Sequence, residues 1–228
     1  MQAGVEAFLL LIGVVLALMG QAWWEDREER ETVREYAVNL RVEVSANQEE
    51  LRKAIQKHAS YIKDGTELIQ EMQHPLDPES ILSMKERVVK FGYVSDFRPS
   101  TSSLENLVGS GGLRQLDNTE LQLAISNYAG SIEDHNVLQA ENLKLFFDAY
   151  VPFISDRASL LDFEFVSDSS GLPKRSRFDF DIEVLTGSKV FENLIVRRIS
   201  AEVDAKKYAM RLLQAAEQLK RLLPDNAA

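Results

Sequence analysis

The chain contains no cysteine, and this absence excludes several kinds of chemistry at once. Disulfide bonds, thiolate metal sites and cysteine nucleophiles all need the thiol group. Histidine is nearly as scarce: its three copies, His58, His74 and His135, never pair as HxxxH or HExxH. The sequence therefore gives no support for a zinc hydrolase. The compartment stays open, because a large helical domain is stable without disulfides on either side of a membrane.

Nucleotide-binding and catalytic signatures are missing as well. No GxSxG, no Walker P-loop and no GxGxxG after a strand is present. The GSGG stretch at 109–112 is better explained as a helix-ending turn than as an anion site. A net charge of −10 repels phosphate backbones. We therefore expect no enzyme, no catalytic, cofactor-binding or metal-binding residues, no cofactor and no nucleic-acid partner.

No proline occurs between Met1 and His74, so nothing in the first third of the chain interrupts a helix. From Val33 onward, mostly apolar residues recur with 4-3 spacing, which is typical of a heptad seam. The seam serves either a homo-oligomeric coiled coil or the core of the chain's own bundle. Three of its positions, Asn47, His58 and Gly65, favour the intramolecular bundle. The seam residues are Val33, Ala37, Leu40, Val44, Asn47, Leu51, Ala54, His58, Tyr61, Gly65, Leu68 and Met72.

An uncharged run of 18 residues, Ala7 to Trp24, precedes the seam. As a helix it is about 27 Å long, close to the ~30 Å of bilayer hydrocarbon. Trp23 and Trp24 stand where an aromatic belt meets the headgroups. A cleaved signal peptide is disfavoured, because it needs a basic start and a small-residue cleavage site. The run predicts a transmembrane anchor over 1–24 that carries an extrinsic helical domain over 25–228.

Small residues within the run, Gly13, Ala17 and Gly20, form a stripe on which another membrane helix can pack closely. The orientation of the anchor is contested. Four arginines follow the run, at positions 27, 30, 34 and 41, and place the domain in the cytoplasm by the positive-inside rule. Each of them has Asp or Glu within one turn, however, so local pairing weakens this argument.

The rest of the chain is predicted to be helical over 78–91, over a short segment beginning at Ser100 or Thr101, over 119–150 and over 189–223. The expected caps are Asp77, then Ser100 or Thr101, and then Asn118 or Thr119. Long helices joined in this way predict an all-α fold with an antiparallel bundle. Residues 163–188 form an irregular insert whose FDFDIEVL stretch suggests a short extended segment.

The insert also holds the one dense basic patch, PKRSR at 173–177. Its cations are Lys174, Arg175 and Arg177. They are candidates for contact with anionic lipid or an acidic partner, and the alternative is an ordinary solvated loop.

Three stretches together resemble a family of uncharacterised bacterial single-span membrane proteins: 5–51, 101–130 and 190–223. The shared features are a short apolar span with a Trp-containing junction, an Arg/Glu-rich run, a Gly turn before a leucine helix, and a C-terminal helix. The resemblance implies an inner-membrane location. Many members have a basic N-terminal tail that would export the domain to the periplasm. This chain lacks the tail, so its own residues leave the orientation open. The resemblance favours a periplasmic domain, and the arginine count favours a cytoplasmic one.

From these features we expect a non-enzymatic accessory subunit that contacts membrane lipid and other integral membrane subunits. Respiratory, photosynthetic reaction-centre/antenna and transport complexes are all candidate hosts. Homo-oligomerisation is less favoured. The alternative is a membrane-anchored sensor or ligand-binding module that signals through the long N-terminal helix.

Overall fold

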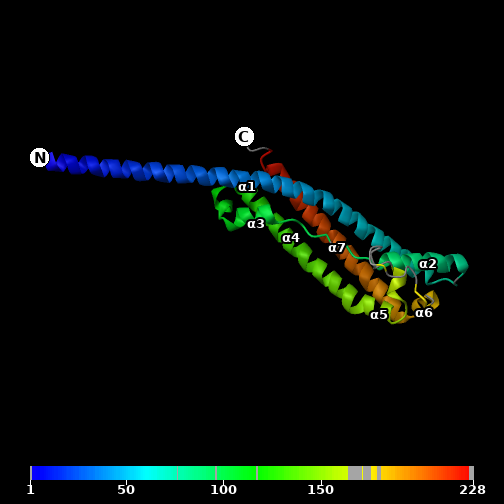
Figure 1. Ribbon diagram of the computed structural model, residues 1–228. Helices are drawn as coiled ribbons and strands as arrows, with labels where there is room; N and C mark the ends of the chain where they lie inside the picture. Colours follow the sequence, from blue (N-terminus) through cyan, green and yellow to red (C-terminus); the bar gives the residue numbers. More distant parts are fainter. Residues whose placement is uncertain are drawn as a thin grey trace. The chain divides into compact units, whose positions relative to one another are not determined.

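A computed structural model describes residues 2–75, 77–95, 97–116, 118–163, 171, 176–178 and 181–225, without the side chains of 2–11, 26 and 163. Every regular element of this part is helical, with no strand, which confirms the all-α class (Figure 1). The long helices are α1 (Gln2–Glu71), α4 (Thr119–Leu145) and α7 (Lys189–Leu222). The short ones are α2 (Pro78–Phe91), α3 (Ser102–Gly109), η1 (Gly112–Gln115), η2 (Phe146–Tyr150), α5 (Val151–Ser155), η3 (Leu160–Phe163) and α6 (Ile182–Thr186).

The helices assemble into two compact units. Unit 1 comprises residues 1–46, 100–127 and 217–228, and unit 2 comprises residues 47–99 and 128–216. Helices α1, α4 and α7 each contribute residues to both units.

In unit 1, the seam of α1 is buried as its spacing predicts. Val33, Ala37, Leu40 and Val44 are each at most 6% exposed. Buried side chains of the other segments complete this apolar core: Leu104, Leu107, Leu121, Ala124, Ile125, Leu219 and Leu223.

Two charged side chains of α1 stabilise the ends of other helices in unit 1. The Glu43 carboxylate accepts hydrogen bonds from the backbone N–H groups of Ser103 (2.8 Å) and Leu104 (3.4 Å), at the N-terminus of α3. Arg41 donates to the carbonyl of Lys220 and to that of Leu223 (2.8 Å), at the C-terminus of α7. The negative charge of Glu43 lies at the positive end of the α3 dipole, and the positive charge of Arg41 lies at the negative end of the α7 dipole. Both contacts are therefore favourable.

The cap of α3 therefore differs from the prediction. Thr101 occupies the N-cap position but makes no side-chain cap hydrogen bond. Glu43, distant in sequence, accepts the amide protons instead. The other predicted caps are confirmed: Asp77 accepts from Ser80 N, and Asn118 accepts from the first backbone amides of α4.

In unit 2, the direction of the helices is mixed. Helices α1 and α7 are antiparallel, since His58 meets Glu202 and Gly65 lies against Ile199. Helices α1 and α4 run in the same direction (Figure 1). The predicted antiparallel bundle is therefore correct for α1 with α7 and wrong for α1 with α4.

A return segment makes the parallel arrangement possible. After α2, residues 93–95 and 97 run opposite to α4, so that the carbonyl of Ser95 meets Gln139 and that of Phe97 meets His135. The chain thereby reverses its direction before α4 begins.

The three irregular seam positions also lie inside unit 2. Asn47 donates to the Tyr128 hydroxyl at 2.8 Å, and His58 is 2% exposed. A Cβ on Gly65 would lie 2.7 Å from the Phe91 ring, so any larger residue would require neighbouring side chains to shift. These contacts confirm that the seam serves the chain's own bundle.

The irregular insert is only partly described. Its predicted extended segment, FDFDIEVL at 178–185, is wrong for residues 182–185, which lie in helix α6, while residues 179 and 180 lie outside the described residues. Asp181 is the N-cap of this helix and accepts a hydrogen bond from Glu183 N at 2.9 Å. A local Asx-type cap of this kind outweighs the weak alternating pattern of the sequence.

Candidate functional site

The N-terminal part of α1 is the most unusual surface of unit 1. Every described side chain from position 12 to position 25 is exposed. The exposed fractions include 63% for Leu16, 60% for Trp23 and 64% for Trp24. Figure 1 shows these turns of α1 extending past the other segments of unit 1. An apolar surface of this kind is rare on soluble monomers and marks a contact with a membrane or another protein.

The predicted small-residue stripe lies on this same exposed stretch. Ala17 is exposed, and a Cβ added to Gly13 or Gly20 would meet nothing within 4 Å. The stripe is therefore accessible to a partner helix. Among the residues that the structure describes, no helix combines the length and apolar character needed to cross a membrane. The predicted span over 1–24 stays a prediction.

Of the three cations in the predicted basic patch, the structure describes only Arg177. Lys174 and Arg175 lie outside the described residues. Arg177 is exposed, and its guanidinium lies 4.8 Å from the centre of the Phe178 ring. This contact involves a sequence neighbour and brings Arg177 to no other predicted site residue.

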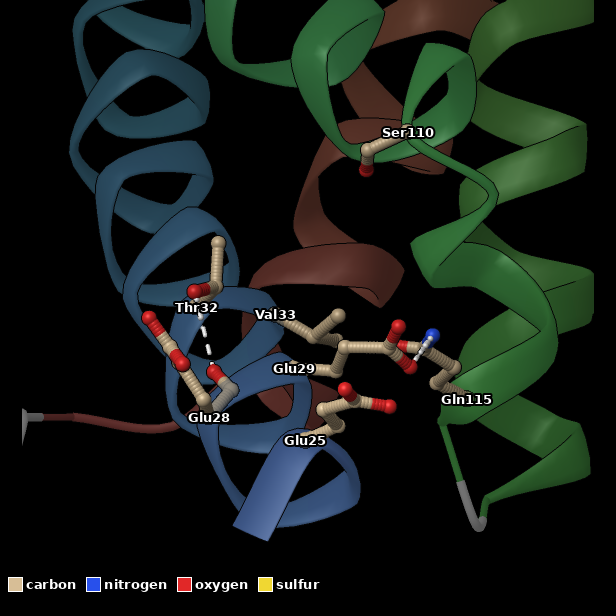
Figure 2. A pocket seen from close by; sticks show the side chains of 7 residues that line it. All are labelled: Glu25, Glu28, Glu29, Thr32, Val33, Ser110 and Gln115. Carbon is tan, nitrogen blue, oxygen red and sulfur yellow. Dashed lines mark hydrogen bonds between the residues drawn. The ribbon is translucent and has the colours of Figure 1, made fainter. Parts of the chain in front are cut away.

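An acidic pocket lies in unit 1, directly after the exposed apolar stretch (Figure 2). Its volume is about 370 Å³, and Glu25, Glu28 and Glu29 of α1 line it. Gln115 donates a hydrogen bond of 2.8 Å to Glu29 (Figure 2). The carboxylates can attract a cationic group, but no trio of metal-ligating side chains is placed to hold a metal ion in the described part of the chain.

Unit 2 contains a buried cation, Arg198 of α7. Its guanidinium donates to the carbonyls of Phe91 (2.7 Å) and Tyr93 (2.9 Å), where α2 ends and the return segment begins. The rings of Phe91, Phe146 and Tyr150 surround it at 4.5, 4.9 and 4.9 Å. Burial lowers the pKa of Arg198 and raises that of the Tyr150 hydroxyl.

An acidic partner and a histidine continue this cluster. Glu202 lies one turn after Arg198, with 3.5 Å between its Oε1 and the guanidinium. His58 Nδ1 of α1 lies 2.6 Å from Glu202 Oε2. The other ring nitrogen of His58, Nε2, is buried and has no hydrogen-bond partner among the described residues.

The remaining buried polar residues of the cluster serve the return segment. Gln139 donates to the carbonyl of Ser95, and His135 Nε2 lies 3.5 Å from the carbonyl of Phe97. Burial lowers the pKa of His135. Gln139, His135 and Arg198 thus bind backbone carbonyls of a segment that belongs to no helix or sheet and so has no regular backbone hydrogen bonds. These three side chains therefore bind the backbone of this segment, whereas His58 and Glu202 contact each other.

Sequence reasoning missed this cluster, because its members come from three distant segments. The signal was present as polar side chains on apolar helix faces: His58 interrupts the seam of α1, and Arg198 lies between Ile195 and Ile199 on α7. A periodicity argument marks such positions as anomalies without identifying their partners.

Comparison with known proteins adds no relative. No family model, no curated protein and no solved structure matches this chain.

Proposed function

We propose that the chain is a membrane-anchored, non-enzymatic accessory subunit whose helical part packs against larger membrane proteins and stabilises their assembly. Residues 1–24 form the anchor, and the rest of units 1 and 2 forms the extrinsic part. The favoured location is the bacterial inner membrane with the extrinsic part in the periplasm.

The observation that carries the proposal is the exposed apolar start of α1. The sequence continues this character back to Ala7, although the side chains of 7–11 lie outside the described residues. Exposure of these Leu, Val, Met and Trp side chains to water is unfavourable by about 25 cal/mol per Å² of apolar surface. Lipid around most of the helix, with a partner helix on the stripe of Gly13, Ala17 and Gly20, removes this surface from water.

The polar clusters support a structural role over catalysis. In unit 1, Glu43 and Arg41 bind helix ends, and in unit 2 Arg198 binds the carbonyls of Phe91 and Tyr93. Each therefore already serves the fold. The acidic pocket is open and lacks a paired nucleophile, base or metal trio within the described residues.

Gentle detergent extraction followed by native mass measurement tests the proposal. We expect a complex that contains this chain and several different proteins. Replacing Gly13 and Ala17 with Ile should lower the yield of that complex, because the larger side chains separate the helices. The matched control replaces Gly130 and Ala140 of α4, which are also exposed, with Ile. A monomer or homodimer in place of the complex would refute the assembly role.

A membrane-anchored sensor is the second candidate. It is favoured by one observation: the helix that begins at the proposed anchor also carries the buried, half-paired His58 of unit 2. A movement of α1 would therefore change the surroundings of this ring directly. Extraction as a homodimer with no other protein bound would favour this candidate.

A further inference from the structure

The outer face of α7 in unit 2 carries a hollow that no core contact explains. The hollow has a volume of about 320 Å³ and lies entirely on this one helix. We call it the α7 hollow. Its lining residues are Val203, Lys206, Lys207, Met210, Arg211 and Gln214.

The apolar part of this face has regular spacing. Val196, Val203 and Met210 follow one another at intervals of seven residues, so they lie along one line of the helix. Their exposed fractions are 51%, 47% and 46%. A single exposed apolar residue is ordinary, whereas three at the same position of successive heptads form a narrow apolar line along which a second helix can pack.

The charge of the hollow differs from that of the protein. Three of its six lining residues are cations, and none of the six is acidic. The whole chain has a net charge of −10. Lys206, Lys207 and Arg211 make no ion pair with any residue that the structure describes, although Arg211 lies over the Tyr208 ring at 5.2 Å. The cations are therefore available to carboxylates from outside.

The geometry points to an acidic amphipathic helix of a partner protein as the occupant of the α7 hollow. An apolar side chain of that helix lies between Val203 and Met210, as a knob enters a hole in a coiled coil. Asp or Glu residues one turn away on the partner meet Lys206, Lys207 and Arg211. This inference rests on the proposed function, since it assigns the surface by which the extrinsic part binds another subunit.

Two other occupants fit the face less well. A second copy of α7 would bring the same cations together across the contact, which is unfavourable. A membrane surface would be met by Trp, Phe or Leu side chains, which interfacial helices use to enter the acyl boundary. The exposed line has only Val and Met, while the opposite side of α7 is buried in the core.

A designed peptide provides the probe. It is a 21-residue helix with Leu at the a and d positions of its heptads and Glu at the e and g positions. The control peptide has Lys in place of Glu. Binding of labelled peptide to the full chain in mild detergent is measured by fluorescence anisotropy. We expect the acidic peptide to bind at least about tenfold more tightly than the basic one, with the difference reduced at 0.5 M salt.

Two pairs of variants locate the binding. Reversing Lys206, Lys207 and Arg211 to Glu should weaken the acidic peptide about tenfold. Reversing exposed Lys57, Lys144 and Lys189 to Glu changes the total charge equally and serves as the control.

The second pair tests the apolar line without changing charge. Val203→Ser should weaken binding several-fold, whereas Val137→Ser on α4, 56% exposed, should leave it unchanged.

Equal binding of both peptides, or equal loss in both reversal variants, would overturn the proposal. Binding to anionic phospholipid vesicles with no binding of the acidic peptide would assign the face to lipid instead. The peptide assay tests only the α7 hollow in unit 2. Peptide binding can therefore fail while membrane anchoring is confirmed, and anchoring can fail while the peptide binds.

Discussion

Arg198 provides the sharpest test of the polar core of unit 2. Its side chain is 3% exposed and binds two backbone carbonyls, three aromatic rings and Glu202. Arg198→Met keeps most of the side-chain volume but leaves both carbonyls and the Glu202 carboxylate without their donor. Removing one partner of a buried ion pair costs about 3–5 kcal/mol of unfolding free energy. For a protein of this size the corresponding fall in Tm is roughly 10 °C.

Urea unfolding of the full chain in mild detergent, followed by circular dichroism at 222 nm, measures this cost. Arg197→Met is the matched control, since Arg197 is the exposed neighbour and its loss should cost less than about 0.5 kcal/mol. Adding Glu202→Gln to Arg198→Met removes the stranded charge and should recover at least about 1 kcal/mol. Equal costs for Arg198→Met and Arg197→Met, or strict additivity in the double variant, would refute the role given to this cluster.

Three further perturbations follow from the packing. Glu43→Ala should destabilise unit 1 by about 1–2 kcal/mol because α3 loses its cap, and Glu43→Gln should recover part of this in the same urea assay. Gly65→Ala should cost about 1–3 kcal/mol through its clash with the Phe91 ring, whereas Gly130→Ala, which meets open space, should raise Tm. The folded pKa of His135 lies below its ordinary 6.5, so the unfolded chain takes up the proton first. Stability is therefore lost as pH falls below 6.5, and His135→Gln should reduce the fall in Tm between pH 7.5 and pH 5; an identical fall would contradict the assignment.

Local signals in the sequence were sufficient for most helix boundaries. Asp77 followed by Pro78 predicts the start of α2, and the structure has both in those positions. Gly111 adopts φ of 76° in the turn after α3, as its place in GSGG indicates. These features depend on a few neighbouring residues, which a sequence displays directly.

Contacts between distant residues could not be predicted in the same way. The capping of α3 by Glu43 depends on the fold of unit 1, and the partners of Arg198 depend on the path of the chain after α2. That path also explains why α1 and α4 are parallel, which helix lengths and turns do not reveal. The irregular residues in the seam of α1 did indicate an intramolecular bundle, because polar side chains in a core need specific partners.

Cysteine labelling in sealed membranes tests the central claim, and the absence of native cysteine removes any background. Val15 and Glu35 are both exposed positions of α1, about 30 Å apart along the helix. A water-soluble maleimide should react with Glu35→Cys from one side of the membrane only. It should react with Val15→Cys only after detergent is added, since a thiol in hydrocarbon does not ionise. Equal reaction of both positions in sealed membranes would contradict the anchor.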